Sequence, residues 1–114
     1  MKSHDLVRVK HMIEAADEAI SFAQAKNRGH LHKDRMLTVA LMREIEVVGE
    51  AASKLSEDFK LLHPEIPWAL IIGMRNKLIH AYFDINLDIL WQTVTVNLPL
   101  LKEQLDTILE PSTE

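Results

Sequence analysis

Apolar side chains recur every three or four residues over two long stretches of the chain, which is the spacing of an amphipathic α-helix. In the first stretch the apolar positions are Leu6, Val9, Ile13, Ala16, Ile20 and Ala23. In the second stretch they are Leu37, Leu41, Ile45, Val48, Ala52 and Leu55. The pattern predicts one helix that Ser3 or Asp5 caps and Gly29 ends, and a second helix that begins near Asp34.

The second half of the chain predicts two further helices. Residues 56–67, "SEDFKLLHPEIP", contain two prolines and indicate a connector. A third helix is expected to contain residues 68–82, "WALIIGMRNKLIHAY", and Asp84 or Asn86 can cap a fourth. The apolar positions of the fourth helix are Leu87, Leu90, Trp91, Val94, Leu98, Leu101, Leu105 and Ile108.

Four helices with short connections predict an all-α fold, an antiparallel four-helix bundle, in which each apolar stripe is buried against its neighbours. The length of 114 residues suits one domain, 1–114, and only three glycines interrupt it. Pro99 is expected to bend the last helix, because proline removes one intrahelical hydrogen bond.

Composition narrows the functions that the chain can have. The absence of cysteine excludes a disulfide framework, a thiolate zinc site and a cysteine nucleophile, and is compatible with a cytoplasmic location. The longest apolar run, residues 68–74, is too short to span a bilayer, so we expect a soluble protein with no membrane partner. A net charge of −4 argues against broad coating of nucleic acid, and any polyanion must bind a local patch.

One such patch is visible in the sequence. Residues 66–83 contain no Asp or Glu, whereas Arg75, Lys77 and His80 all lie there. Arginine offers a planar fork of donors that suits phosphate, and histidine exchanges protons near neutral pH. Together these side chains suit phosphoryl chemistry without a metal ion.

Spacing limits how these residues can meet. On one ideal helix Arg75 and His80 point about 140° apart, whereas Asn76 lies one turn below His80 and Tyr82 returns to within about 20° of Arg75. Three arrangements can bring Arg75 and His80 together: the arginine curls round, the helix loosens near His80, or two copies of the chain share one site. We favour the last, a twofold dimer with a single cleft.

These residues carry a resemblance to a known family. Arg75, His80 and Tyr82 form the pattern R-x4-H-x-Y. Around them, "VGEAASKL" at 48–55 and "HPEIPWALIIGMRNKLIHAYFDINLDILW" at 63–91 extend the match. Over essentially its whole length the chain resembles the HepT-type toxin branch of the HEPN superfamily.

The resemblance implies a homodimeric, metal-independent endoribonuclease without a cofactor, acting as the toxin of a toxin–antitoxin pair. Arg75 would bind the scissile phosphate, His80 would transfer the proton and Asn76 would orient His80, with Lys77 able to contact RNA. A 2′,3′-cyclic phosphate would be the product. An MNT-type nucleotidyltransferase antitoxin would silence the enzyme by transferring AMP to Tyr82, which adds bulk and negative charge.

Other interpretations of the pattern stay open. The chain can instead be a non-catalytic helical subunit that accompanies a nucleotidyltransferase, or a dimeric bundle with no RNA role. Asn76 can be a structural amide and Tyr82 an interfacial aromatic residue. Trp68 and Trp91 are expected to anchor the core or the dimer contact.

Several polar residues outside the motif have simpler predicted roles. His30, His32 and Asp34, with Leu31 between them, lack the spacing of an established metal site, and residues 29–34 are also where the family resemblance is loosest. We expect them to be exposed polar residues. Glu44, Glu46 and Glu50 indicate a solvated helix face, although Glu50 can reach the cleft. Gly73 is expected to allow close helix packing.

Overall fold

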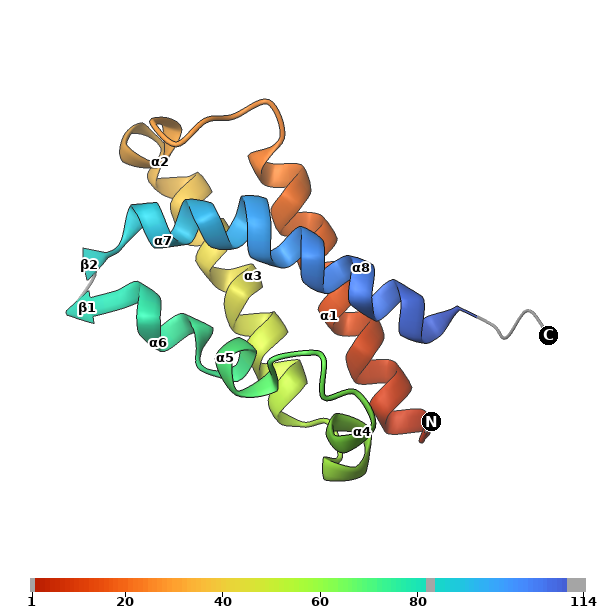
Figure 1. Cartoon of the computed structure of the whole chain (residues 1–114). Helices are drawn as coiled ribbons and strands as arrows, with labels where there is room; N and C mark the ends of the chain where they lie inside the picture. Colours follow the sequence, from red (N-terminus) through yellow and green to blue (C-terminus); the bar gives the residue numbers. More distant parts are fainter. Residues whose placement is uncertain (1, 82–83, 111–114) are drawn as a thin grey trace.

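The computed structural model describes residues 2–81 and 84–110, without the side chains of residues 79–81. Helices dominate it, which confirms the all-α class (Figure 1). They are α1 (Ser3–Ala23), α2 (His30–Lys33), α3 (Arg35–Ser53), α4 (Glu57–Leu62), α5 (Trp68–Ile72), α6 (Met74–Leu78), α7 (Leu87–Gln92), the π-helical turn η1 (Thr93–Asn97) and α8 (Leu98–Leu109). Two short strands, β1 (Ile79–Ala81) and β2 (Asp84–Ile85), pair antiparallel.

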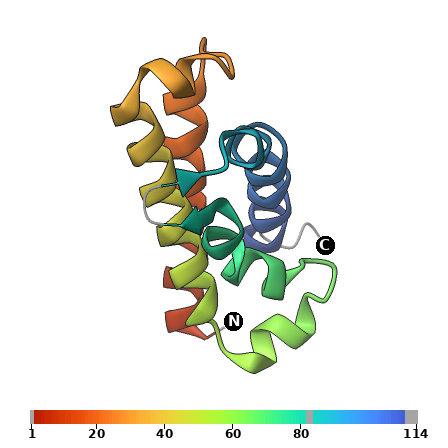
Figure 2. The same ribbon diagram turned by 90° about the vertical axis from the view of Figure 1, so that its left-hand side faces the viewer.

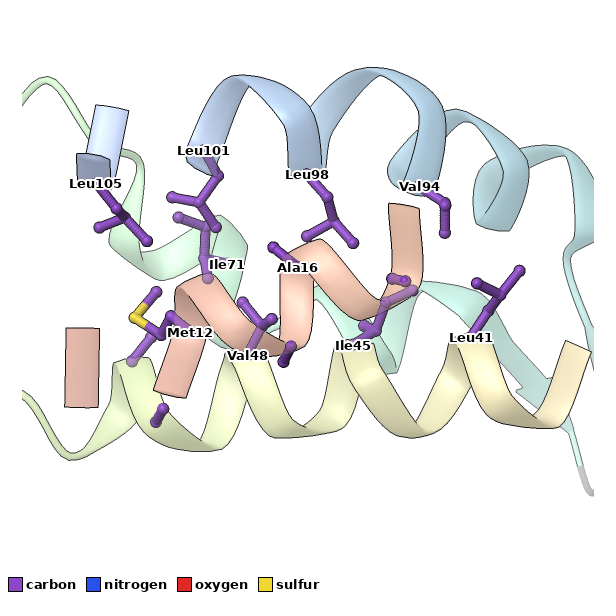
Figure 3. Packing of buried hydrophobic residues seen from close by; sticks show 14 of the residues in the cluster. Met12, Ala16, Leu41, Ile45, Val48, Ile71, Val94, Leu98, Leu101 and Leu105 are labelled. Atoms are coloured by element: carbon purple, nitrogen blue, oxygen red, sulfur yellow. The ribbon is translucent and has the colours of Figure 1, made fainter. Parts of the chain in front are cut away.

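The two longest helices, α1 and α3, run antiparallel and side by side (Figures 1 and 2). The α7–η1–α8 helix packs across α1, and α5 and α6 contact α3. Leu41, Ile45 and Val48 of α3 point toward the C-terminal helix, from which Leu98 and Leu101 point back (Figure 3). Each such leucine or isoleucine contributes roughly 1.5–3 kcal/mol by leaving water, so this core fixes where α3 presents its outer face.

Hydrogen bonds at the helix ends correct part of the sequence-based prediction. The start of α3 is confirmed, because Asp34 Oδ1 accepts a hydrogen bond from Leu37 N at 3.0 Å. The predicted caps of α1 are wrong: the helix begins after Lys2 without a side-chain cap, and it ends at Ala23 before Gly29 is reached. The buried Asp5 carboxylate instead accepts hydrogen bonds from Ser56, 51 residues away, and so ties α1 to the start of α4.

The predicted third helix is shorter and interrupted. The connector before it contains α4, which Ser56 caps by accepting a hydrogen bond from Phe59 N. The helix breaks at Gly73 between α5 and α6, in keeping with the roughly 1 kcal/mol that glycine costs inside a helix. It then ends at Leu78, whose carbonyl accepts a hydrogen bond from Asn86 N at 2.8 Å. The prediction that it continues to residue 82 is wrong.

The fourth predicted helix is present with an irregularity near Pro99. Asn86 Oδ1 accepts a hydrogen bond from Ile89 N at 3.1 Å and caps α7, as one of the two predicted caps. Just before Pro99, Leu98 N donates to Thr93 O, one residue further back than in an α-helix. The wider turn lies where proline would otherwise crowd the preceding turn. Among the described residues, no helix is both long and apolar enough to cross a membrane.

Candidate active site

A close approach between α3 and the end of α5 begins the site. A Cβ atom added at Gly49 of α3 would lie 3.3 Å from the Ile71 carbonyl oxygen and 3.4 Å from that of Ile72. Glycine therefore lets the backbone of α5 rest against α3, and α6, which follows α5 directly, starts beside the same helix. We expected this role for Gly73, but a Cβ there would meet only Ala69 O in the preceding turn.

This packing places Arg75, in α6, against Glu46 in α3. Arg75 Nε donates to Glu46 Oε1 at 2.6 Å, and the Arg75 side chain is 50% exposed. The other carboxylate oxygen of Glu46 lies 3.5 Å from Arg43 Nη1. Glu46 therefore holds Arg75 through one nitrogen and links it to a second arginine, while the Arg75 side chain stays half exposed.

Arg75 and Asn76 share a cavity of about 400 Å³ with the outer face of α3. Its lining residues are Ile45, Glu46, Gly49, Glu50, Ser53, Ile72, Arg75 and Asn76. The structure thus brings Arg75, Asn76 and Glu50 together, as the sequence suggested for Glu50. It places Lys77 elsewhere, on the wall of a more apolar cavity between α5–α6 and α7–α8.

The motif histidine follows Arg75 on the short strand β1. The backbone of His80 lies in β1, between Ile79, which pairs with Ile85, and Ala81, which pairs with Asp84. The His80 side chain and the whole of Tyr82 lie outside the described residues. Because α6 ends at Leu78, before His80, the ideal-helix angles do not apply to Arg75 and His80, and how the two side chains meet stays a prediction. Asn76 and His80 are therefore not one helical turn apart, and the supporting role of Asn76 stays a prediction.

The remaining polar residues of α3 do not form one solvated face. Glu44 is only 7% exposed, next to Glu18 of α1, so its predicted solvated position is wrong. Burial raises the pKa of Glu44 from 4.5 to about 7, helped by a hydrogen bond to Glu18 and by the Glu18 charge. The buried position of Glu44 follows from the helical period, because residue 44 lies beside the buried stripe that contains Ile45 and Val48. The sequence therefore contained the signal for this burial.

Residues outside the cavity have structural roles. Trp68 is buried, as predicted, and its Nε1 donates to His63 O at 3.0 Å, whereas Trp91 is partly buried against the core. Leu31 is buried, so the expectation of an exposed segment is wrong for it. His30 Nδ1 accepts a hydrogen bond from Asn27 N at 2.9 Å. In residues 2–81 and 84–110, no group of three or more His, Asp or Glu side chains is placed to hold a metal ion.

The fold and the cavity define an all-α protein with an arginine held beside a cavity against α3 and with a histidine on the short strand that follows α6. The chain belongs to the HepT-like family, described as ribonuclease HepT-like, whose sequence profile matches residues 12–108. The match includes every motif residue.

Relatives with similar sequences carry ribonuclease names. A protein of Caldanaerobacter subterraneus subsp. tengcongensis named "Putative RNase" is 35% identical over 90% of this chain and 91% of its own length. The "Probable ribonuclease HepT" of Thermococcus cleftensis is 44% identical over 66% of this chain and 68% of its own. A "Putative RNase" of Methanocaldococcus jannaschii is 31% identical over 85% of this chain and 89% of its own. No solved structure matches the chain.

Proposed function

We propose that this protein is a metal-independent endoribonuclease, the toxin of a toxin–antitoxin pair, which acts in the cytoplasm as a homodimer of HEPN-like four-helix subunits. The observation that carries the proposal is Arg75, whose guanidinium Glu46 holds beside a cavity and whose side chain is half exposed, in a chain of the ribonuclease HepT-like family. Arg75 and His80 are the proposed catalytic residues.

The geometry of the Arg75–Glu46 pair suits phosphate binding. The pair engages Nε, so the two terminal NH2 groups of the guanidinium remain available to phosphate oxygens. The carboxylate also fixes one orientation of a side chain that otherwise has many rotamers, which lowers the entropy lost on binding. Arg75 can then stabilise the negative charge that builds on the phosphate oxygens in the transition state.

The proposed reaction is an internal transfer at the RNA backbone. The ribose 2′-oxygen attacks the adjacent phosphorus, and its proton passes to a histidine that acts as general base. The bond from phosphorus to the 5′-oxygen breaks, and a second proton, from His80 of the same or the partner subunit, goes to that leaving oxygen. The products are a 2′,3′-cyclic phosphate and a 5′-hydroxyl end, and DNA is inert because it lacks the nucleophile.

The proposed antitoxin is an MNT-type nucleotidyltransferase that transfers AMP from ATP to Tyr82. Tyr82 lies two residues after His80 and follows β1 directly, so a modification there is close in sequence to the proposed acid–base group. Each AMP unit would add a phosphate with negative charge next to a site that has to bind RNA phosphate.

Purified protein tests the ribonuclease reaction directly. We expect the wild type to cleave single-stranded RNA in the presence of EDTA, to leave cyclic phosphate ends and to spare DNA of the same sequence. Arg75→Ala and His80→Ala should each lower the cleavage rate by roughly 100-fold or more. Arg35→Ala, which removes an exposed arginine from the first turn of α3, should cleave at the wild-type rate.

Retained cleavage in folded His80→Ala protein, or equal cleavage of DNA, would overturn the mechanism. Folding is checked by circular dichroism, so a dead variant is not confused with an unfolded one. If the wild type neither cleaves RNA nor arrests growth, the alternative of a non-catalytic helical subunit is favoured.

Co-expression with a neighbouring nucleotidyltransferase tests the regulation separately. We expect the intact mass to rise by whole AMP units in the wild type and to stay unchanged in Tyr82→Phe. The modified protein should lose RNA cleavage, whereas Tyr82→Phe should remain active under the same treatment. Modification at another residue, or none, would contradict the role of Tyr82 and leave the cleavage test standing.

A further inference from the structure

A second cavity, of about 180 Å³, lies between α1 and α3 and shares Glu50 with the cavity beside Arg75. We call it the basic groove, because cationic and titratable side chains make up most of its lining. The lining residues are Arg8, His11, Arg43, Val47, Glu50, Ala51 and Lys54. The chain as a whole has a net charge of −4, yet three permanent cations and one histidine line this small cavity. The local charge is therefore far more positive than the average of the chain.

One of these cations has a donor that the fold leaves unsatisfied. Arg8 Nε is buried and has no acceptor among the described residues. A buried charged donor without an acceptor is unfavourable, and a ligand oxygen would supply the acceptor if the Arg8 side chain, which lines the groove, turned toward it. Arg8 therefore stands to gain a hydrogen bond when an anion binds in the groove.

The carboxylates near the groove leave a positive balance. Glu50 is the one acidic residue of the lining, and it lies 3.4 Å from Lys54 Nζ in an exposed pair. Glu46 lies outside the lining and is shared between Arg43 and Arg75. Exposed ion pairs of this kind contribute little to stability, so Arg43 and Lys54 can exchange these carboxylates for phosphate oxygens.

The groove lies next to the candidate active site. Glu50 of α3 lines both cavities. Glu46, also in α3, pairs with Arg75 of the first cavity and with Arg43 of the second. A single-stranded polyanion bound at Arg75 can therefore cross α3 beside the Arg75–Glu46–Arg43 ion pairs and reach the cations of the basic groove.

We propose that the basic groove between α1 and α3 binds a second phosphodiester of the RNA, next to the one that Arg75 holds. This inference rests on the proposed function and adds a substrate-binding subsite with Arg8 as its buried donor. It makes cleavage depend on substrate length, because a dinucleotide has one phosphodiester and cannot occupy both positions. The subsite affects binding, while Arg75 and His80 carry out the reaction.

Cleavage kinetics on two substrates test the subsite. We compare a dinucleoside monophosphate with an octanucleotide for the wild type, Arg8→Gln, Lys54→Gln and their combination. For the double variant we expect KM for the octanucleotide to rise about tenfold with kcat unchanged, and the constants for the dinucleotide to stay at wild-type values. Lys10→Gln is the matched control: it removes an exposed cation of α1 that does not line the groove, and it should change neither substrate.

Binding measured without catalysis separates the two proposals. By fluorescence anisotropy with labelled octanucleotide, the slope of log affinity against log salt should become shallower by about 0.7 for each RNA phosphate that the variant no longer neutralises. Wild-type binding and salt slope in the double variant, or equal effects on both substrate lengths, would overturn the subsite. Absence of cleavage by the wild type would count against the proposed reaction, and the salt slopes would still decide whether the groove binds RNA.

Discussion

The Arg75–Glu46 contact joins residues 29 positions apart in the sequence, and it decides how the motif arginine is presented. The sequence identified Arg75 by its place in R-x4-H-x-Y and assigned Glu46 to a solvated face. Periodicity shows which residues share a helix face but not which side chain of another helix meets that face. The contact depends on tertiary packing at Gly49, whose role the local pattern did not reveal.

Substituting Glu46 tests whether it positions Arg75. Glu46→Gln keeps an oxygen that can accept from Arg75 Nε but removes a negative charge beside the phosphate site. We expect a lower KM for RNA and a kcat within a few-fold of the wild type. Glu46→Ala also removes the acceptor, so kcat should fall roughly tenfold, about the worth of one charged hydrogen bond. Identical kcat and KM in Glu46→Ala and the wild type would show that the pair has no positioning role.

Glu44 makes the stability of the protein depend on pH. Its pKa is raised to about 7 in the folded protein, so the folded state binds a proton that the unfolded chain releases above 4.5. The stabilisation that protonated Glu44 provides is present in full below about pH 4.5 and is lost as the pH rises through about 7. The free energy of unfolding should therefore fall between these pH values, by roughly 3 kcal/mol at most.

Urea unfolding at several pH values measures the effect of Glu44. Glu44→Gln should be more stable than the wild type at pH 8, and its stability should change less between pH 5 and pH 8, conditions that lie on either side of the raised pKa of about 7. Glu14→Gln is a suitable control, because Glu14 is an exposed glutamate of α1 near the same surface. Parallel pH profiles for Glu44→Gln and the wild type would contradict the buried carboxyl pair.

At the scale of elements, amphipathic periodicity predicted the long helices well and their ends poorly. The predicted stripe of α3 is buried throughout, and Leu98, Leu101 and Leu105 of α8 are buried as expected. In α1 the buried face is displaced from the predicted stripe: Leu6, Ile13 and Ile20 are only half-buried, whereas Met12, Ala15 and Ala19 are buried. The predicted helix start near Asp34 and the Asn86 cap, one of two predicted for α7, are confirmed, because both side chains accept a hydrogen bond within their own helix. Asp5 was misassigned because its partners belong to a segment 51 residues away.

The tie between Asp5 and Ser56 should be measurable as stability. Asp5 is 1% exposed and accepts hydrogen bonds from Ser56 N at 2.8 Å and Oγ at 2.7 Å. Burial by itself would raise the pKa of Asp5, but these hydrogen bonds, with smaller contributions from His4 and Lys2, lower it. Because the pKa is lowered, the stabilisation is present above pH 3.8 and is lost as the pH falls through the pKa that Asp5 has in the folded protein.

Asp5→Ala should lower the free energy of unfolding at pH 7 by roughly 2 kcal/mol, because it leaves Ser56 N without its acceptor at a partly buried position. Asp58→Ala is the matched control, since Asp58 lies in the first turn of α4 but is 81% exposed and 4.0 Å from Lys2 Nζ. It should cost less than about 0.5 kcal/mol. Chemical denaturation gives both values, and equal losses in the two variants would contradict the tie.

The end of the third helix shows why sequence alone could not complete the site. Residues 68–82 have a helical composition, yet the chain leaves the helix at Leu78 and forms β1, whose partner β2 comes from beyond the motif. Hydrogen bonds between Leu78 and Asn86 and along the strand pair replace those of the lost helical turn. Local propensity differs between these alternatives by less than about 1 kcal/mol per residue, so the pairing of distant segments decides the outcome.

At the scale of the whole molecule, the proposed reaction needs one group for the attacking oxygen and one for the leaving oxygen. One His80 can fill both roles in turn, because an imidazole that has taken the proton of the 2′-hydroxyl can then give a proton to the leaving oxygen. In a twofold dimer, Arg75 of one subunit can serve the same linkage as His80 of the other. We therefore expect dimers in solution, by mass photometry or analytical ultracentrifugation, whose cleavage activity falls when dilution separates the subunits.

Mixing two inactive variants tests whether subunits share the site. If each site takes Arg75 from one subunit and His80 from the other, an Arg75→Ala/His80→Ala mixed dimer has one intact site and one that lacks both groups. Random exchange makes half of the dimers mixed, so the mixture should regain about a quarter of the wild-type cleavage rate. If both residues act within one subunit, every site in the mixture lacks one group, and activity should stay at the level of the single variants. Incubating the variants separately and mixing them just before the assay provides the control, because unexchanged dimers remain inactive under either arrangement.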